Sequence, residues 1–570
     1  MQFEMKKFYV PVLATALLLL CSCASKMGNL PAEYFAVTPQ VLEAVGGEVP
    51  ATIYGKFPQK FFKKNAILEI TPVLKWNGGS EKSETVTFQG ENVEGNNQTI
   101  SYKMGGAFTM KCKFNYQPEM AKSELYLQFN VKIKNKSYTL PEVKVADGVI
   151  ATSQLYQQTV GSATTATAED AFQRVIKQAK EANIMFLIQQ ANLRASELNS
   201  GNIKEFAQAL KEVAKDKENR VLDNVEVSAY ASPDGGLDLN TNLADSRQNN
   251  ATAYVKKQMK DAKLEGAVDS KYTAEDWEGF QELVSKSNLA DKDLILRVLS
   301  MYSDPEEREA QIKNISSVYK DLTDEILPQL RRARLTLNYQ LIGRSDDEIQ
   351  AAFASNPSQL SIEELLYAAT LTDDNSQKET IYKKVTELFP NDYRAYNNLA
   401  QLSYAKGNVD EAASYLQKAA SLNAGSAEVN TNKGLLALKK GAVEDAETYL
   451  AKGAGSAVSD EALGNLYIAQ GQYTRAESLL GDTKSNSAAL AQILNKNYAK
   501  AKTTLAGIAN PDATTSYLTA VLGARTDNMS MLYDGLKEAV KKDNSYAQKA
   551  KSDLEFAKYF NSDSFLQAIQ

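Results

Sequence analysis

Residues 399–407 have the sequence LAQLSYAKG, and the small side chains in and after this stretch recur at a constant interval. Another small residue follows 34 positions after each of Ala400, Gly407, Ala412 and Ala419. These later residues are Gly434, Gly441, Ala446 and Gly453. Two antiparallel helices cross closely only where the facing residues are small, and stacking of neighbouring pairs buries what one pair leaves exposed. The interval therefore predicts a repeated helical hairpin.

The same positions resemble the tetratricopeptide repeat family. One unit matches the family pattern at Leu399, Ala400, Tyr404, Gly407, Ala412, Leu416 and Ala419, and a later unit matches it at Leu463, Gly464, Tyr467, Gly471, Ala476 and Leu480. Weaker units end at Phe389-Pro390-Asn391 and continue over 489–505 and 520–539. The resemblance implies roughly five or six hairpins that stack into an α-helical solenoid over residues 344–570.

The resemblance also implies a concave groove, lined by the first helix of each pair. The side chains assigned to this groove are mixed in polarity: Arg394, Asn397, Gln401, Tyr404, Glu428, Thr431, Leu435, Lys439, Glu461 and Asn465. An extended peptide or a helix fits such a groove, and we expect the partner to be an envelope or secretion-system protein. In the alternative interpretation, the aliphatic members only pack together and the groove is unused.

The N-terminal part has the pattern of β-strands. Between residues 50 and 145, runs such as 66–70, 84–88 and 125–131 alternate in polarity, and clusters of Gly, Asn and Ser separate them. This pattern predicts a β-sandwich, with a domain that covers residues 23–160. The stretch 159–167 is rich in Thr, Ala, Ser and Gly and is interpreted as a linker.

Residues 161–343 have a βαβ rhythm. The pattern predicts a helix over 168–182, a strand over 184–188, a helix over 202–214, a strand over 224–230 and a long helix from about Asn240. The sequence from Ala229 to Gly235, followed by Asn240, Leu243 and Arg247, resembles the OmpA C-terminal-like peptidoglycan-binding family in its Bacteroidetes form. Residues 330–337 resemble its last strand, and the helical stretch before them resembles its long insertion. The predicted fold class is multidomain α+β, with an N-terminal β-sandwich, an OmpA-like βαβ domain with a helical insertion, and the C-terminal solenoid.

The resemblance also implies a binding site for the cell wall. In the family, an Asp takes the ammonium of diaminopimelate and an Arg takes its carboxylate, and the Arg corresponds to Arg247 here. Ser232 fills the position of the Asp, and Asp234 is the nearest acidic substitute. The resemblance thus assigns peptidoglycan binding to Arg247, Ser232 and Asp234. In the alternative interpretation, Arg247 pairs with Asp245 or Asp238 on a solvated helix face.

The N-terminus resembles a lipoprotein signal. Lys6 and Lys7 precede an apolar run over 10–20, and the sequence Leu20-Cys21-Ser22-Cys23 resembles a lipobox in which the Cys23 thiol is acylated. We expect a signal peptide over 1–22 and a lipid anchor in the outer membrane. No acidic run follows Cys23, which favours the periplasmic face over surface exposure. The alternative is an ordinary signal peptide with incidental cysteines.

Composition restricts the chemistry. The sequence contains no histidine, which excludes Ser-His-Asp triads, Cys-His dyads and histidine-ligated metals. We predict no catalytic residue, no cofactor and no metal site, although carboxylate chemistry stays formally open. The net charge of −6 becomes −7 when Glu4, Lys6 and Lys7 leave with the signal, so nucleic acid is not an expected partner. Apart from the lipidated residue, only Cys112 remains, and we expect it to be buried and unreactive.

Two functions are compatible with these features. The first is a non-catalytic envelope scaffold, which associates with peptidoglycan through the OmpA-like domain and recruits a protein partner through the repeats. The second is a surface-exposed adhesion or assembly component whose OmpA-like domain is only structural.

Overall fold

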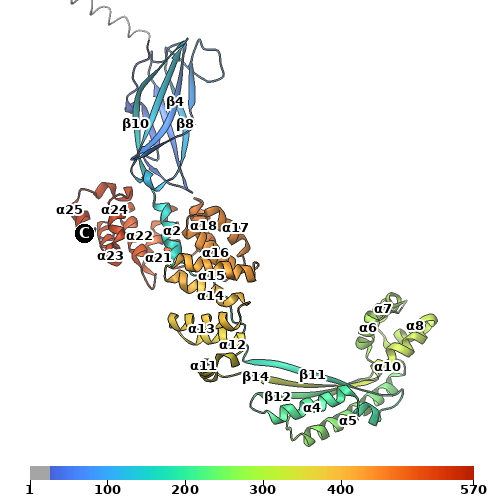
Figure 1. Cartoon of the computed structure of the whole chain (residues 1–570). Coiled ribbons are helices and arrows are strands. Elements are labelled where there is room, and N and C mark those ends of the chain that lie inside the picture. Colours follow the sequence, from blue (N-terminus) through green and yellow to red (C-terminus); the bar gives the residue numbers. More distant parts are fainter. Residues whose placement is uncertain (1–25, 290) are drawn as a thin grey trace, which may run out of the picture. The chain divides into compact units, whose positions relative to one another are not determined.

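The computed structural model describes residues 26–289 and 291–570 and divides them into two compact units (Figure 1). Unit 1 contains the chain up to Glu169 together with Thr372–Gln570, and unit 2 contains Asp170–Leu371. The predicted signal peptide and Cys23 lie outside the described residues. Among the helices of the described residues, none combines the length and hydropathy that a membrane span requires.

The N-terminal part of unit 1 consists of two β-sheets around one core. The three-stranded sheet has the order β1 (Phe35–Thr38), β3 (Glu48–Phe57), β8 (Gly106–Asn115). The seven-stranded sheet has the order β2 (Val41–Glu43), β10 (Lys136–Ile150), β9 (Ser123–Ile133), β4 (Ala66–Trp76), β6 (Val86–Gly90), β7 (Gln98–Ile100), and β5 (Gly79–Lys82) pairs with β4. Buried and open positions alternate along β3 and β8, and Phe57, Phe88 and Phe108 contact one another in the core. The predicted β-rich N-terminal part is confirmed.

The C-terminal part of unit 1 consists of antiparallel helix pairs. The helices are α13 (Asn375–Leu388), α14 (Tyr393–Ala405), α15 (Val409–Leu422), α16 (Ala427–Lys439), α17 (Val443–Lys452), α18 (Ser459–Ala469), α19 (Tyr473–Leu480), α20 (Asn486–Leu494), α21 (Tyr498–Ala506), α22 (Ala513–Arg525), α23 (Met529–Lys542), α24 (Ser545–Ala550) and α25 (Asp563–Ala568). A Cβ added to Gly434 would lie 2.4 Å from the Leu450 side chain, and one added to Gly464 would lie 2.5 Å from Leu480. The predicted helical hairpins are therefore confirmed, and small residues permit their close crossing.

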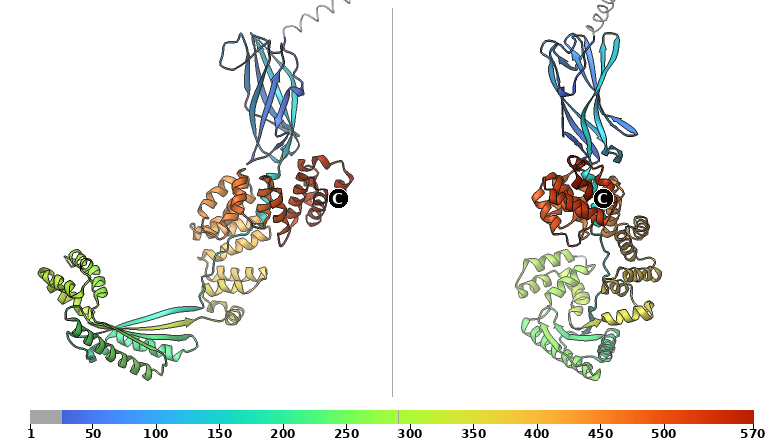
Figure 2. Two further views of the ribbon diagram at one scale, coloured as in Figure 1. Left: turned by 180° about the vertical axis from the view of Figure 1, so that it is seen from behind. Right: turned by 90° about the vertical axis from the view of Figure 1, so that its left-hand side faces the viewer.

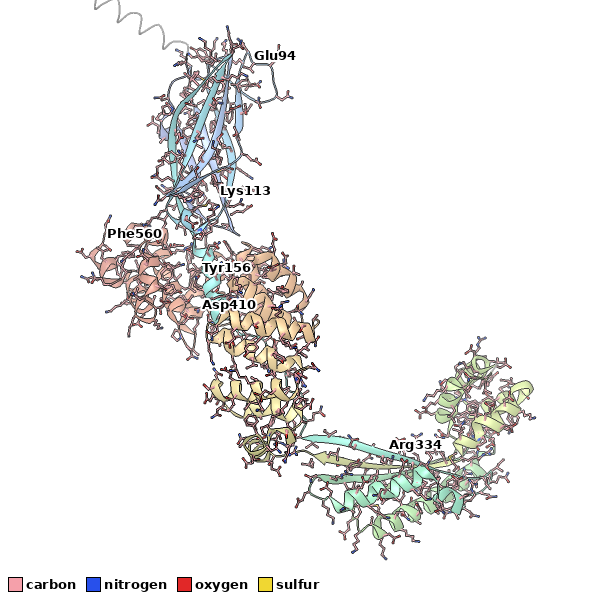
Figure 3. All side chains as sticks on the ribbon, viewed as in Figure 1. Glu94, Lys113, Tyr156, Arg334, Asp410 and Phe560 are labelled. Carbon is pink, nitrogen blue, oxygen red and sulfur yellow. The ribbon has the colours of Figure 1, made fainter. Side chains whose placement is uncertain are left out.

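The stretch interpreted as a linker packs against the helix pairs. Residues 152–162 form short helical turns, η4 (Thr152–Leu155), α2 (Tyr156–Thr159) and η5 (Val160–Ser162), which lie among the helices of the repeats (Figures 1 and 3). Leu155, Tyr156, Val160 and Ala163 are buried in the same hydrophobic core as the helix pairs. The small polar composition of the stretch suggested flexibility, but tertiary packing overrides this local tendency.

Unit 2 is built on a four-stranded sheet with the order β11 (Val175–Met185), β14 (Arg332–Ile342), β12 (Arg220–Tyr230), β13 (Val268–Thr273). Helices α4 (Gly201–Lys215) and α5 (Leu237–Asp261) cover one face of this sheet, as Figures 1 and 2 show. Their apolar side chains Phe206, Leu210 and Val255 join Val227 and Leu335 of the strands in one core.

The helix expected over 168–182 is absent from unit 2, and that prediction was wrong. Strand β11 occupies the second half of this range and pairs with β14 over its whole length, from Val175 opposite Ile342 to Met185 opposite Arg332. The apolar residues of this stretch are spaced as in an amphipathic helix, but the antiparallel ladder satisfies the backbone. Sequence periodicity reports a local preference, whereas the partner strand lies more than a hundred residues away in the chain.

The predicted helical insertion of unit 2 has its own core. It contains α6 (Trp277–Lys286), α7 (Lys292–Met301), α8 (Pro305–Asn314), α9 (Ser316–Asp321), a π-helical turn (Leu322–Ile326) and α10 (Leu327–Leu330). Phe280, Val284, Ile295 and Leu330 are among the residues of this core. Two further helices, α11 (Asp346–Ser355) and α12 (Ile362–Ala368), follow β14, and each starts with a capping box.

Substitution of Gly523 by alanine tests the close crossing of α22 and α23. The added Cβ would lie 2.4 Å from the amide nitrogen of Leu532, and this backbone atom cannot easily move away. Overpacking of this kind costs about 1–3 kcal/mol, which exceeds the ~1 kcal/mol that alanine gains over glycine within a helix. Thermal unfolding followed by circular dichroism should show a lower Tm for Gly523→Ala. Gly425→Ala is the control, because its nearest neighbour would be 3.7 Å away. Equal Tm values for the two variants would contradict this packing.

Candidate functional site

The inner face of the helix pairs in unit 1 binds a segment of the same chain, residues 159–168, which leaves the last helical turn at Ser162 and then runs without helix or strand. Asn398 on α14 donates from Nδ2 to the carbonyl of Ala168 at 3.0 Å, and its Oδ1 accepts from the Ala168 amide at 2.9 Å. Asn432 on α16 makes the same pair of bonds with Ala166, at 2.8 and 2.7 Å. The two asparagines are 34 positions apart in the sequence, and the residues they hold are two apart. One step along the repeats thus corresponds to one two-residue period of an extended chain.

Further side chains of the helices bind the rest of the segment. The Tyr404 hydroxyl donates to the carbonyl of Val160 at 2.6 Å. Four more predicted groove residues contact the segment. Gln401 Nε2 donates to Thr165 O at 3.0 Å, and Asn397 Nδ2 donates to Ala166 O at 2.9 Å. Glu461 accepts from the Thr164 amide at 3.1 Å, and Asn465 accepts from the Thr159 hydroxyl at 3.2 Å. We call this set of residues, with Asn398 and Asn432, the repeat groove.

The remaining predicted groove residues, apart from Lys439, have partners outside the segment. Arg394 pairs with Asp392 at 2.9 Å, and Glu428 accepts from the Ser426 hydroxyl at 2.6 Å. Thr431 donates to the carbonyl of Gly453, and Leu435 is buried in the core. Lys439 lies beside Gly161, and burial lowers the pKa of its amine.

Asn398 and Asn432 were not among the sequence-predicted residues. The signal for them was weak, since an asparagine at an inward position of a helix is also a common capping or packing residue. Their role depends on the segment that they bind, which lies 230 positions before Asn398 in the sequence. A buried backbone needs a partner for each N–H and C=O group, and the two asparagine amides supply both kinds at Ala166 and Ala168.

The segment suits this groove because its side chains are small. Ala163, Ala166 and Ala168 are at most 8% exposed, so the backbone of the segment approaches the helices closely. In the helical turn that precedes the segment, Ser153 Oγ donates to the carbonyl of Ala44 at 2.8 Å, and the Thr152 hydroxyl donates to Glu555. The repeat groove as described is therefore occupied by the chain itself.

The second candidate site lies in unit 2, where the ends of β12 and β14 meet the first turns of α5. Arg247 on α5 is 1% exposed and stacks on the Phe186 ring at 5.1 Å. Its Nε, Nη1 and Nη2 donate to the carbonyls of Gln190, Tyr230 and Leu187 at 3.0, 2.9 and 3.3 Å. The alternative pairing with Asp245 or Asp238 is thus not observed. Within the described residues, Arg247 has no carboxylate partner.

Ser232 and Asp234 form a cluster with Arg331 beside this guanidinium. Ser232 donates from Oγ to Asp234 Oδ1 at 2.5 Å. Arg331 donates from Nη2 to Asp234 Oδ2 at 2.9 Å and from Nε to Ser232 Oγ at 3.2 Å. A small cavity of about 40 Å³ is lined by these residues together with Arg247 and the rim side chains Ile188, Leu239 and Leu243. We call this cavity the Arg247 pocket.

The charges of the Arg247 pocket affect one another. Burial lowers the pKa of Arg247 to about 10, and repulsion from Arg331 acts in the same direction, whereas Asp234 opposes it. The guanidinium remains charged at neutral pH. A buried cation without an anionic partner is costly, and a bound anion would remove much of that cost. The structure brings the three sequence-predicted residues together and adds Arg331, which lies just before β14.

Cys112 lies outside both sites. Its side chain is buried in the sandwich, and burial raises the pKa of the thiol to about 11 because the thiolate is poorly solvated there.

Comparisons with known proteins give matches among solved structures. No protein-family model matches the chain, and no curated protein matches it. A tetratricopeptide repeat protein from Parabacteroides merdae is 14% identical, covers 39% of this chain and 89% of its own, and has a TM-score of 0.28. PilW, a widely conserved type IV pilus biogenesis factor, is 16% identical, with coverages of 36% and 97% and a TM-score of 0.26. Pseudomonas aeruginosa pilF is 17% identical, with coverages of 39% and 98% and a TM-score of 0.25.

Replacement of Asn398 by alanine tests the binding of the segment in the repeat groove. The variant leaves the amide and the carbonyl of Ala168 without their partner, and each unpaired buried group costs about 1–3 kcal/mol. We expect faster hydrogen exchange at Ala168 and earlier proteolysis within 159–168 than in the unmodified protein. Asn544→Ala is the control, because Asn544 is exposed and its side chain caps no helix. Unchanged exchange at Ala168 would show that Asn398 does not hold the segment.

Proposed function

We propose that the chain is a non-catalytic lipoprotein scaffold of the bacterial cell envelope, which associates with peptidoglycan through unit 2. The observation that carries this proposal is the Arg247 pocket, where a buried guanidinium without an anionic partner faces a small cavity. Three of the five N–H groups of Arg247 donate to backbone carbonyls, which leaves two for a ligand. A guanidinium binds a carboxylate through two parallel hydrogen bonds.

The identity of the ligand follows from the sequence around the pocket. Residues 229–247 resemble the peptidoglycan-binding family, in which the corresponding Arg takes a carboxylate of the wall peptide. The wall peptides carry such carboxylates, and the envelope is where an acylated protein would meet them. This reasoning supports an OmpA-like role for unit 2 in wall association.

The repeats supply the scaffold. Segment 159–168 fills the repeat groove, so we assign recruitment of an envelope or secretion-system protein to the helix faces outside this groove. The helical turns just before the segment link the two parts of unit 1, because Ser153 bonds to Ala44 on the β-sheet side and Tyr156 is buried in the core of the helix pairs. Cys23 would hold this assembly at the outer membrane, on its periplasmic face.

Co-sedimentation with purified murein sacculi tests the wall association. Arg247→Ala removes the carboxylate-binding group, and we expect the apparent affinity to fall about tenfold or more, as for loss of a charge-assisted pair. Arg297→Ala is the matched control, because Arg297 is exposed on α7 and away from the pocket. Circular dichroism and hydrogen exchange at α5 establish that the Arg247 variant is folded. Failure of the unmodified protein to sediment with sacculi would remove the wall-binding half of the proposal.

Protease treatment of intact cells tests the membrane side. A protein on the periplasmic face should resist added protease until the outer membrane is permeabilised, because the protease cannot cross it. A surface protein of the same cells serves as the positive control. Cleavage in intact cells would instead favour the alternative, in which the chain is a surface adhesion or assembly component and unit 2 is only structural.

A further inference from the structure

The charge balance of the Arg247 pocket differs from that of a site for a zwitterion. It contains the guanidinium groups of Arg247 and Arg331 and the single carboxylate of Asp234. Both oxygens of this carboxylate already accept hydrogen bonds, Oδ1 from Ser232 and Oδ2 from Arg331. An ammonium group that entered the pocket would find its acidic partner engaged and two cations close by. The pocket thus disfavours an ammonium and favours an anion.

The anion-binding side is preorganised. The three carbonyls of Leu187, Gln190 and Tyr230 hold the Arg247 guanidinium in place, so that binding costs little side-chain entropy. Its remaining N–H groups belong to a residue that is 1% exposed and lines the cavity. Removal of water from this position strengthens the attraction of a carboxylate to the guanidinium.

The size of the cavity and its rim limit the rest of the ligand. A volume of about 40 Å³ has room for a few water molecules, since one water needs roughly 10–15 Å³ on this measure. A carboxylate with a small substituent fits such a space, and a long side chain does not. Ile188 and Leu239 line the pocket and are 58% and 45% exposed, so they offer apolar surface to the part of the ligand outside.

We infer that the Arg247 pocket binds the free terminal carboxylate of a peptide that ends in a small residue such as alanine, and not the paired ammonium and carboxylate of diaminopimelate. This inference rests on the proposed wall association, since wall stem peptides end in D-alanine with a free carboxylate. Ser232 in place of an acidic residue is consistent with this preference, because the pocket then has a single carboxylate, that of Asp234, which already pairs with Arg331.

Calorimetric titration of the full-length protein with short probes tests the inference. The probes are acetyl-D-alanyl-D-alanine, its C-terminal amide, meso-diaminopimelate and acetyl-L-alanyl-L-alanine. We expect the D,D-acid to bind at least tenfold more tightly than its amide, and more tightly than diaminopimelate. Equal binding of acid and amide, or preference for diaminopimelate, would overturn the inference. Tighter binding of the L,L-acid would overturn the assignment to the wall stem and indicate a protein C-terminus instead.

Variants of the rim keep the test independent of folding. Leu239→Ser removes apolar surface that lines the pocket, and we expect it to weaken binding of the D,D-acid several-fold. Leu237→Ser is the matched control on the same helix, because Leu237 is 50% exposed and does not line the pocket. Equal loss in both variants, or loss in neither, would contradict the role of the rim. Arg247→Lys keeps the charge but not the planar pair of donors, and it should lose most of the preference for acid over amide.

The two proposals fail in different ways. Sedimentation with sacculi together with a preference for diaminopimelate would overturn this inference and leave the wall association standing. Binding of the D,D-acid without sedimentation would overturn the wall association and leave the carboxylate pocket standing.

Discussion

Every N–H and C=O group of a buried backbone needs a hydrogen-bond partner, and unit 1 depends on how this requirement is met for residues 159–168. The segment forms no strand or helix ladder over Ala166 and Ala168, so side-chain amides take the place of a neighbouring strand. Asn398 and Asn432 each supply one donor and one acceptor. Because the segment is held in this way, its apolar residues complete the core of the helix pairs. A groove that would otherwise be solvent-filled becomes interior.

The bound segment changes which surface of the helix pairs is open to a ligand. Tetratricopeptide-like helix pairs leave their inner face open for a ligand, whereas here the face is covered by the chain's own backbone. The buried residues just before and within the segment belong to the core of the helix pairs, whereas the β-sheets of unit 1 have a core of their own. Under the proposed function, a partner of unit 1 would bind to surfaces outside this groove. The small residues at the helix crossings, such as Gly434 and Gly464, serve the packing of the pairs and not the groove.

The pocket of unit 2 combines a closed cluster with an isolated cation. Asp234 accepts from both Ser232 and Arg331. Arg247 is left as the cation without an anion among the described residues, supported by carbonyls that hold it at the base of the pocket. The burial of such a charge is costly in the absence of a ligand, and functional sites are where proteins retain costs of this kind.

Local patterns in the sequence were enough to predict the helical hairpins, from the 34-residue interval of small residues, and the β-rich part, from the alternation of its strands. These patterns identify elements because helix and strand impose their own periods on neighbouring residues. Long-range contacts were needed to establish that 175–185 is a strand, that 159–168 occupies the repeat groove, and that Asp234 pairs with Arg331. In each of these cases the partner lies about a hundred or more positions away, and no local period carries that information. The candidate residues Arg247, Ser232 and Asp234 could be named from the sequence, but their hydrogen bonds could not.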